Sequence, residues 1–96
     1  MQRVKQEFCE LPFVITFNGK RVTGKIDRLC ERGDGTWMVI DYKSEGVVPE
    51  EYALVAETYA VSMGIYVEAA RQILPGKTVE GWLYFTETGE FWNAGT

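Results

Sequence analysis

The sequence predicts an α+β fold: an antiparallel β-meander, one long amphipathic helix packed on the sheet, and a further strand after the helix. Three observations carry this prediction. The residues before Lys43 alternate as in strands and are interrupted by Gly-containing turns, residues 49–74 repeat with a helical period, and strand-forming residues return at Val79. With 96 residues, of which 46% are hydrophobic, we expect one domain around one core.

The chain begins with two strands joined by a tight turn. Residues 3–10 alternate moderately between polar and apolar types, and residues 13–17 are strong strand formers. Pro12, between them, predicts a bend or a bulge. The Asn-Gly dipeptide at 18–19 is the strongest short signal for a two-residue hairpin turn. A second long strand is therefore expected over residues 20–31.

The Asn-Gly turn also fixes which residues face each other. It pairs Phe17 with Lys20 and, carried along both strands, sets Glu10 across from Asp27. Carboxylates in directly opposed positions lie roughly 5 Å apart at Cβ and repel, so a bound cation would relieve them. A bulge at Pro12 would slip this register by one residue and move Glu10 to the other face.

The second turn decides whether two aspartates meet. A two-residue loop would leave Asp41 on the opposite face from Asp27, whereas an odd connection brings the two together. We predict a five-residue loop over residues 32–36, because it also pairs Leu29 with Val39. The third strand, residues 37–43, then carries Asp41 toward Asp27.

That third strand ends in a charged pair. Side chains on a strand alternate, so Asp41 and Lys43 point to the same face, one step apart. A carboxylate and an ammonium at the end of a buried strand are costly unless they are paired or bound to something. The simplest explanation is a surface ion pair, and the alternative is a functional site.

A helix follows a loop at residues 44–48. Pro49 in the first turn, with two acidic residues after it, predicts the helix start. Pro75 ends the helix after about six turns, and a strand over 79–86 with a short edge strand at 91–92 completes the chain. The apolar stripe of this helix consists of Tyr52, Val55, Ala56, Tyr59, Met63, Tyr66, Ala70, Ile73 and Leu74.

Composition excludes several classes of function. The chain has no histidine, which rules out within it a Ser-His-Asp triad and a typical zinc site. Two cysteines without metal spacing, Cys9 and Cys30, suggest a reduced cytoplasmic protein and are too few for an iron–sulfur cluster. A net charge of −4 argues against a protein that coats DNA. No apolar run approaches the roughly 20 residues of a membrane span, so no membrane partner is expected.

Several segments, taken in order, resemble one nuclease family. They are 10–13 (Glu-Leu-Pro-Phe), 24–29 (Gly-Lys-Ile-Asp-Arg-Leu), 39–44 (Val-Ile-Asp-Tyr-Lys-Ser), the Tyr-rich helix, and 81–85 (Gly-Trp-Leu-Tyr-Phe). This order and spacing resembles the RecB-like branch of the PD-(D/E)XK nuclease superfamily. Within that branch it is most similar to the nuclease domains at the C-terminus of superfamily-1 helicases of the AddA type. The resemblance implies the core of the restriction-endonuclease-like fold.

The resemblance also implies a site. It assigns metal binding to Asp27 and Asp41, a further ligand to the backbone carbonyl of Tyr42, and a catalytic role beside the two aspartates to Lys43. Glu10 is an additional candidate ligand. Oxygen ligands suit Mg²⁺ or Mn²⁺, and a bound metal would activate water and offset charge on a scissile phosphate.

By the same resemblance, residues 1–96 form a single nuclease domain within a larger helicase–nuclease that acts in DNA recombination and repair. The implied partners are DNA, the helicase domain of the same parent chain and a second helicase–nuclease subunit. The candidate contacts to DNA are Arg28 and Lys25.

Two departures from the family pattern support other readings. The branch usually carries a histidine ligand on an upstream helix, and Val55 stands where a glutamine usually precedes the tyrosine that matches Tyr59. The alternative is a non-catalytic, degenerate nuclease-fold module that serves as a scaffold or binds DNA ends. A third possibility is an unrelated α+β interaction domain, which Asp27 and Asp41 on opposite faces would support.

Overall fold

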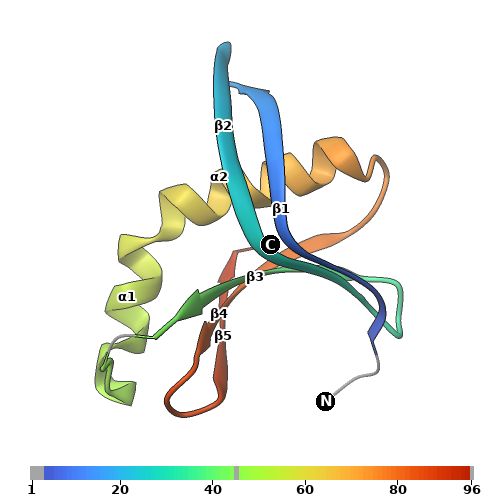
Figure 1. Cartoon of the computed structure of the whole chain (residues 1–96). Helices are drawn as coiled ribbons and strands as arrows, with labels where there is room; N and C mark the ends of the chain where they lie inside the picture. The colour runs from blue at the N-terminus through green and yellow to red at the C-terminus, as the bar shows by residue number, and fades with distance from the viewer. Residues whose placement is uncertain (1–3, 45, 96) are drawn as a thin grey trace.

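One five-stranded sheet with helices against one of its faces makes up the fold (Figure 1). The computed structural model describes residues 4–44 and 46–95, so Arg3, expected in the first strand, and position 45 of the expected loop lie outside it. The strands follow their sequence order across the sheet, and every pairing is antiparallel except that of the third and fourth strands. The elements are β1 (Val4–Phe17), β2 (Lys20–Arg32), β3 (Trp37–Lys43), the 3₁₀ turn η1 (Pro49–Glu51), α1 (Tyr52–Thr58), α2 (Ala60–Ile73), β4 (Val79–Phe85) and β5 (Glu90–Gly95).

The first hairpin has the register that the Asn-Gly turn predicts. Phe17 pairs with Lys20, and the pairing continues without a slip back to Gln6. Pro12 pairs in register with Lys25, so of the bend or bulge expected there the bulge is wrong. Proline is tolerated because β1 is an edge strand. The register shift of this hairpin lies between Val4 and Gln6, and Glu10 has a φ of 49°, in the left-handed region.

The second hairpin confirms the odd connection. Leu29 pairs with Val39, and five residues, from Arg32 to Thr36, lie between the last paired positions Glu31 and Trp37. The Arg32 amide donates to the Thr36 carbonyl at 2.8 Å, and the Gly35 amide donates to the Arg32 carbonyl at 3.0 Å. Asp27 and Asp41 therefore fall in opposed positions by continuation of this register.

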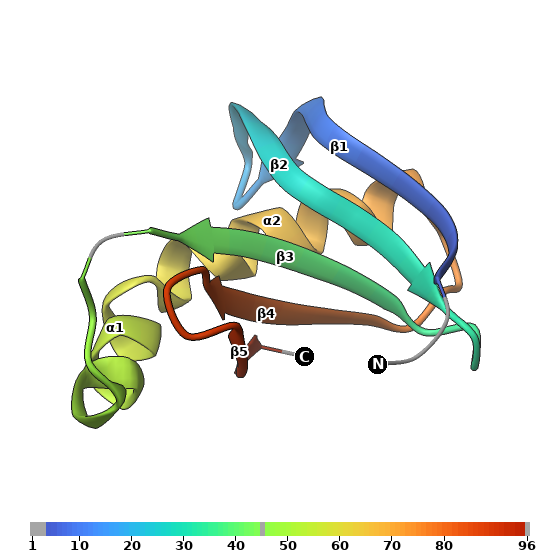
Figure 2. The same cartoon turned by 60° about the horizontal axis from the view of Figure 1, so that its bottom comes forward.

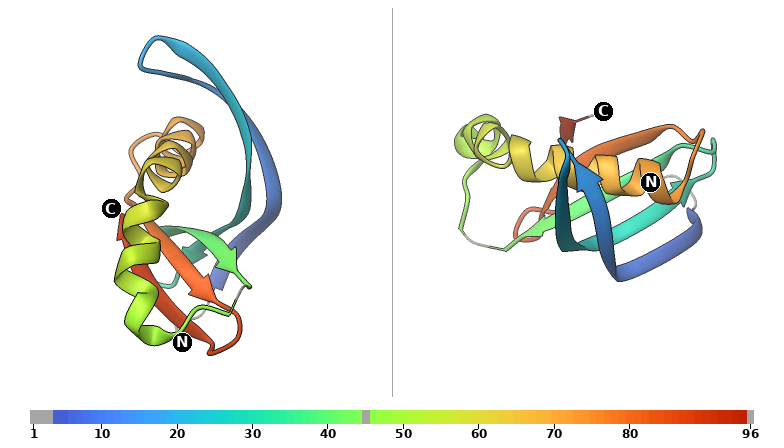
Figure 3. Two further views of the ribbon diagram at one scale, coloured as in Figure 1. Left: turned by 90° about the vertical axis from the view of Figure 1, so that its left-hand side faces the viewer. Right: turned by 90° about the horizontal axis from the view of Figure 1, so that it is seen from above.

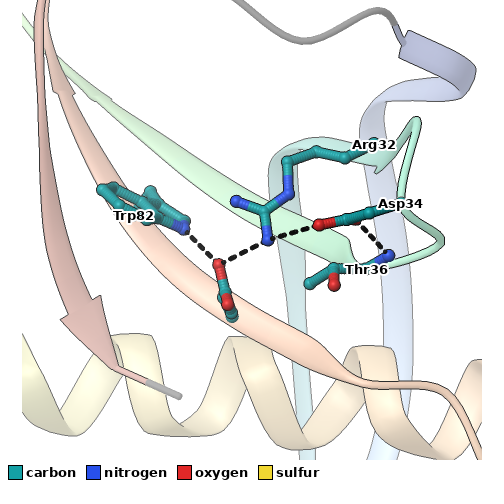
Figure 4. Close-up of polar contacts among 5 residues, drawn as sticks. Arg32, Asp34, Thr36 and Trp82 are labelled. Carbon is teal, nitrogen blue, oxygen red and sulfur yellow. Dashed lines mark hydrogen bonds and ion pairs between the residues drawn. The ribbon is translucent and has the colours of Figure 1, made fainter.

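Polar side chains fasten this loop to β4 (Figure 4). Asp34 accepts a hydrogen bond from the Thr36 amide at 2.9 Å, which lowers the pKa of Asp34. The Arg32 guanidinium lies 3.5 Å from the Asp34 carboxylate and 3.3 Å from that of Glu80. Glu80 also accepts from the indole nitrogen of Trp82 at 3.1 Å. The loop is thus tied to a strand that follows it by more than forty residues in the chain.

Beyond the base of the sheet, β2 leaves β3. The two strands pair only from Arg28–Ile40 to Glu31–Trp37, after which β3 continues with β4 alone. The remaining parts of β1 and β2, residues 11–26, form a two-stranded arm that rises from the sheet and arches over α2 (Figures 1 and 3).

The arm packs on α2 through its inner face. Phe13 meets Tyr66 edge to face with ring centroids 6.0 Å apart, and Gln72 donates to the Thr16 carbonyl at 3.1 Å. Ile26 is fully buried here. Leu29, three positions later, is also buried, although strict alternation would turn it outward. The inward face of β2 therefore changes between the arm and the sheet.

The single helix expected after Pro49 is wrong, because the structure has two. α1 ends at Thr58, and Tyr59 has φ −95° and ψ 7°, outside helical geometry. The Thr58 hydroxyl donates to the Leu54 carbonyl at 2.9 Å, a bond of the kind that bends helices. Backbone bonds continue across the break, from Tyr59 to Val55 and from Met63 to Tyr59, so the axis turns without separating the helices.

The core lies between the sheet and these helices. Tyr52 of α1 stacks on Phe85 with ring centroids 3.9 Å apart, and its hydroxyl lies 2.7 Å from that of Thr88. The strands expected after the helix are confirmed as β4 and β5. No helix in the described part of the chain is long and apolar enough to cross a membrane. The buried core cluster comprises Phe13, Ile15, Ile26, Leu29, Trp37, Val39, Tyr52, Met63, Val67, Ala69, Ala70, Val79, Leu83 and Phe85.

Gly81 tests how closely α2 packs on β4. A Cβ at Gly81 would lie 2.7 Å from Met63 and 3.1 Å from Val67. We expect Gly81→Ala to lower the free energy of unfolding by about 1–3 kcal/mol through overpacking. Gly64 on the exposed side of α2 has nothing within 4 Å, so Gly64→Ala should be neutral or stabilising by up to ~1 kcal/mol. Urea titrations of both variants measure this difference, and equal effects would contradict the packing described.

Candidate active site

The candidate site lies at the split between the arm and the carboxyl end of β3 (Figure 2). Because β2 has left the ladder there, no residue of β2 is paired with Tyr42 in the sheet. The carboxylate of Asp27 instead accepts the Tyr42 N–H at 3.1 Å. A side chain thus replaces a ladder bond, and the acid is fixed against the backbone between Asp41 and Lys43.

Asp41 and Lys43 lie on the helix-facing side of β3 and are largely buried. Their side chains are 16% and 12% exposed, and the Lys43 ammonium lies 3.0 Å from the Asp41 carboxylate. Neighbouring positions on β4 are the buried residues Leu83 and Phe85. This pair is therefore not the solvated surface ion pair that the sequence left open.

The two aspartates meet in the split. Burial raises the pKa of Asp41, and the contact with the Asp27 carboxyl raises it further, while Lys43 opposes both effects. Two half-buried carboxyl groups in contact are unfavourable unless a proton or a cation lies between them. Paired carboxylates of this kind suit a hard divalent cation. Their arrangement fits a metal-binding role.

Tyr59 completes the surroundings of Lys43. The ammonium lies 3.4 Å from the centroid of the Tyr59 ring, which is the geometry of a cation–π contact. Tyr59 is the residue at the break between α1 and α2. The helix break therefore coincides with the position that covers the lysine.

Two of the predicted residues lie elsewhere. Glu10 pairs with Lys25 at 2.9 Å and is 75% exposed, so the structure does not bring its carboxylate to the two aspartates. Arg28 pairs with Glu7 at 2.9 Å on the face of the sheet away from the helices. Within residues 4–44 and 46–95, no cluster of three or more carboxylate or thiol side chains is found that could hold a metal ion.

Tyr42 sits between the site residues but turns its ring to the outer face. The ring meets Tyr84 edge to face at 5.8 Å and is 40% exposed. Its backbone, by contrast, lies between Asp41 and Lys43 and is held by Asp27. Tyr42 thus belongs to the site through its main chain alone.

The sequence predicts Tyr59 as a core residue of the helical stripe and does not indicate its contact with Lys43. A signal was present, because a lysine at the end of a buried strand needs a partner beyond one carboxylate. Val55, four residues earlier, is half-buried and packs against the core. It offers no polar group to the site.

Comparisons with known proteins show the family of the chain. A family model of the PD-(D/E)XK nuclease superfamily matches residues 1–91. The chain belongs to the PD-(D/E)XK nuclease superfamily. It is also 37% identical over 94 residues to an ATP-dependent helicase/nuclease subunit of Lysinibacillus sphaericus (strain C3-41). That match covers 86% of the chain and 8% of the relative, so the chain spans a small part of the relative's length.

Membership in the PD-(D/E)XK superfamily confirms the resemblance found in the sequence. The α+β architecture is the core of the restriction-endonuclease-like fold, with the correction that the sheet is mixed and the helix is broken. Nucleases of this superfamily generally use divalent metal ions. The contact between Asp27 and Asp41 is compatible with such an ion.

The raised pKa of Asp41 predicts that the metal-free chain becomes less stable as Asp41 ionises. The folded state keeps a proton on Asp41 that the unfolded state has lost, so stability falls as pH rises from the ordinary aspartate pKa to the raised one. We expect Asp41→Asn to melt at a higher temperature than the wild type at neutral pH in EDTA. The difference should vanish at about pH 3.

The matched control for this experiment is Asp34→Asn. The Thr36 amide lowers the pKa of Asp34, so its stabilisation is present at neutral pH and is lost as pH falls through the lowered pKa. This variant should melt below the wild type at neutral pH, with the gap closing in acid. Melting curves that show the same sign for both variants would refute the assignment.

The contact between Lys43 and Tyr59 predicts a spectroscopic signature. The ring should shift the Lys43 side-chain protons upfield in the NMR spectrum of the wild type and of Tyr59→Phe, because both keep an aromatic face. In Tyr59→Leu this shift should be lost, and the ammonium should be held more weakly by roughly 1 kcal/mol. Unchanged Lys43 shifts in the leucine variant would show that the ring does not cover the lysine.

Proposed function

We propose that this chain is the metal-dependent DNA nuclease core of a helicase–nuclease that acts in DNA recombination and repair. The observation that carries the proposal is the contact between Asp27 and Asp41 with Lys43 3.0 Å from the second carboxylate. Belonging to a nuclease superfamily sets the reaction class, and the helicase/nuclease relative suggests the wider context.

Each site residue has a distinct role in this proposal. Asp27 and Asp41, with the backbone carbonyl of Tyr42, would hold Mg²⁺ or Mn²⁺, and Glu10 is an additional candidate ligand that would first have to leave Lys25. The ion, when bound, supplies Lewis acidity toward the phosphate and lowers the pKa of water. Lys43 presents a fixed ammonium that can orient the attacking water or offset negative charge that develops on the phosphate.

The parent protein is part of the proposal as well. The chain would be a single nuclease domain in a longer cytoplasmic chain that also holds a helicase. Its substrate would be DNA, and its partner would be a second helicase–nuclease subunit. The match to a small part of a helicase/nuclease relative supports this context. Both residues proposed from the sequence as DNA contacts are paired with an acid, Arg28 with Glu7 and Lys25 with Glu10, and of the two the Lys25 side chain is the more exposed.

A second candidate is a non-catalytic module that keeps the fold and binds DNA ends or acts as a scaffold. The observation in its favour is the small ligand set. Two aspartates meet in the split, Glu10 is paired elsewhere, and the chain contains no histidine. Such a module could retain a metal without cutting.

Two measurements on the 96-residue chain separate these candidates. Mn²⁺ should broaden the NMR signals around Asp27 and Asp41 in the wild type, and the broadening should disappear in Asp41→Ala but persist in Asp34→Ala. In Mg²⁺ the wild type should cut labelled single- or double-stranded DNA. Lys43→Ala should reduce cutting by about a hundredfold or more, within the range known for the loss of one charge-stabilising group.

The outcomes have different meanings. Metal binding without cutting by the wild type would favour the non-catalytic module. If Mn²⁺ does not selectively broaden the NMR signals around Asp27 and Asp41 in the wild type, the proposed metal site is wrong. A Lys77→Ala variant, which removes an exposed cation after α2, is the control for Lys43→Ala and should cut as the wild type does.

A further inference from the structure

The arm formed by residues 11–26 has an unusual charge composition. It contains three of the ten lysine and arginine residues of the chain and none of its fourteen aspartate and glutamate residues. The chain as a whole carries a net charge of −4. The arm is therefore a positively charged projection on an acidic protein. Its cations are Lys20, Arg21 and Lys25.

Two of these cations lie in a row on one face of β2. Arg21, Thr23 and Lys25 occupy alternate positions and are all exposed, so their side chains share the outer face of the arm. The positions beside them on β1 are without charge. These neighbours are Thr16, Val14 and Pro12. The opposite face of the arm carries the buried residues that pack on α2.

The row leads toward the candidate site. β2 is the strand that borders the split, and Asp27 follows Lys25 by two positions on it. Alternate residues on a strand are about 6.7 Å apart, which is comparable with the separation of successive phosphates along an extended nucleic-acid strand.

We propose that Arg21, Thr23 and Lys25 form a phosphate-binding track that holds the backbone of a DNA strand along the arm and directs it to the split at Asp27 and Asp41. This inference rests on the proposed nuclease function for its substrate. Contacts to phosphates fix the position of a strand without reading its sequence, which suits a row of cations and one hydroxyl.

The ion pair at the base of the track gives the proposal a distinctive consequence. Glu10 holds Lys25 at 2.9 Å while both side chains remain more than half exposed. An exposed ion pair contributes little stability, so a phosphate can replace the Glu10 carboxylate on Lys25 at small cost. Glu10 is thus a competitor of DNA, and removing its charge should strengthen binding.

The cations on the arm also have a simpler explanation. Beyond the split it has two exposed strand edges, and cations on such edges keep proteins from pairing edge to edge. That explanation predicts aggregation when Arg21 or Lys25 is replaced, with no change in DNA affinity. The phosphate track predicts the reverse, so the two can be distinguished.

The experiment measures binding of a fluorescein-labelled oligothymidylate by fluorescence anisotropy in EDTA, over a series of salt concentrations. Arg21→Ala and Lys25→Ala should each weaken binding about fivefold at about 0.1 M salt and lower the slope of log K against log salt by about 0.7. Lys77→Ala removes one exposed cation outside the arm and should change neither value. Gel filtration and melting curves confirm that each variant is folded and monomeric.

A second pair of variants tests the competition at Lys25. Glu10→Gln should bind DNA more tightly than the wild type, whereas Glu57→Gln, which removes an exposed acid on α1, should not. The proposal is overturned if Arg21→Ala and Lys25→Ala match Lys77→Ala, if Glu10→Gln gains nothing over Glu57→Gln, or if the wild type binds no DNA. The binding assay contains EDTA and so does not depend on cutting. If the chain binds DNA through the track but does not cut it in Mg²⁺, the track is supported and the nuclease proposal fails.

Discussion

The number of residues between β2 and β3 decides which face of the sheet every later side chain occupies. Since side chains on a strand alternate, one residue more or fewer in the loop would turn Asp41 and Lys43 away from Asp27. The five-residue loop is fixed by its own backbone bonds and by Arg32, which bridges Asp34 in the loop and Glu80 on β4. The ion pairs of Arg32 at the start of β3 thus help to fix the register that determines the site at the end of β3.

The sequence predicted what local chemistry determines. The Asn-Gly turn gave the first register, and the demand that Leu29 meet Val39 gave the second, so the approach of Asp27 to Asp41 followed. The separation of β2 from β3 could not be predicted from the local sequence, because it depends on the packing of the arm against α2. The break at Tyr59 was also hidden, since Thr58 and its acceptor carbonyl leave no mark on the hydrophobic period.

Charged side chains are paired differently on the two faces of the sheet. On the outer face, Arg28 and Arg32 find acids at 2.9 Å and 3.3 Å, so these charges are paired. On the helix-facing side, Lys43 pairs with Asp41 at 3.0 Å, yet burial and the contact with Asp27 leave Asp41 with a raised pKa. Stability is thus lost where the chemistry is proposed, a relation common in functional sites. The aromatic ring of Tyr59 adds to the hold on the lysine without neutralising it.

The split between the arm and β3 has a mechanical consequence. Along most of the sheet, separating two strands would break a whole ladder of backbone bonds. At the split, one described hydrogen bond crosses from β2 to β3, from the Tyr42 amide to the Asp27 carboxylate, and a single bond to a charged group contributes about 1.5–3 kcal/mol. The left-handed backbone of Glu10 lies across from Asp27 on β1, at the level where the arm begins. The position of the arm relative to β3 therefore depends chiefly on the packing of its inner face on α2, through Phe13 against Tyr66 and the bond from Gln72 to Thr16, rather than on the sheet.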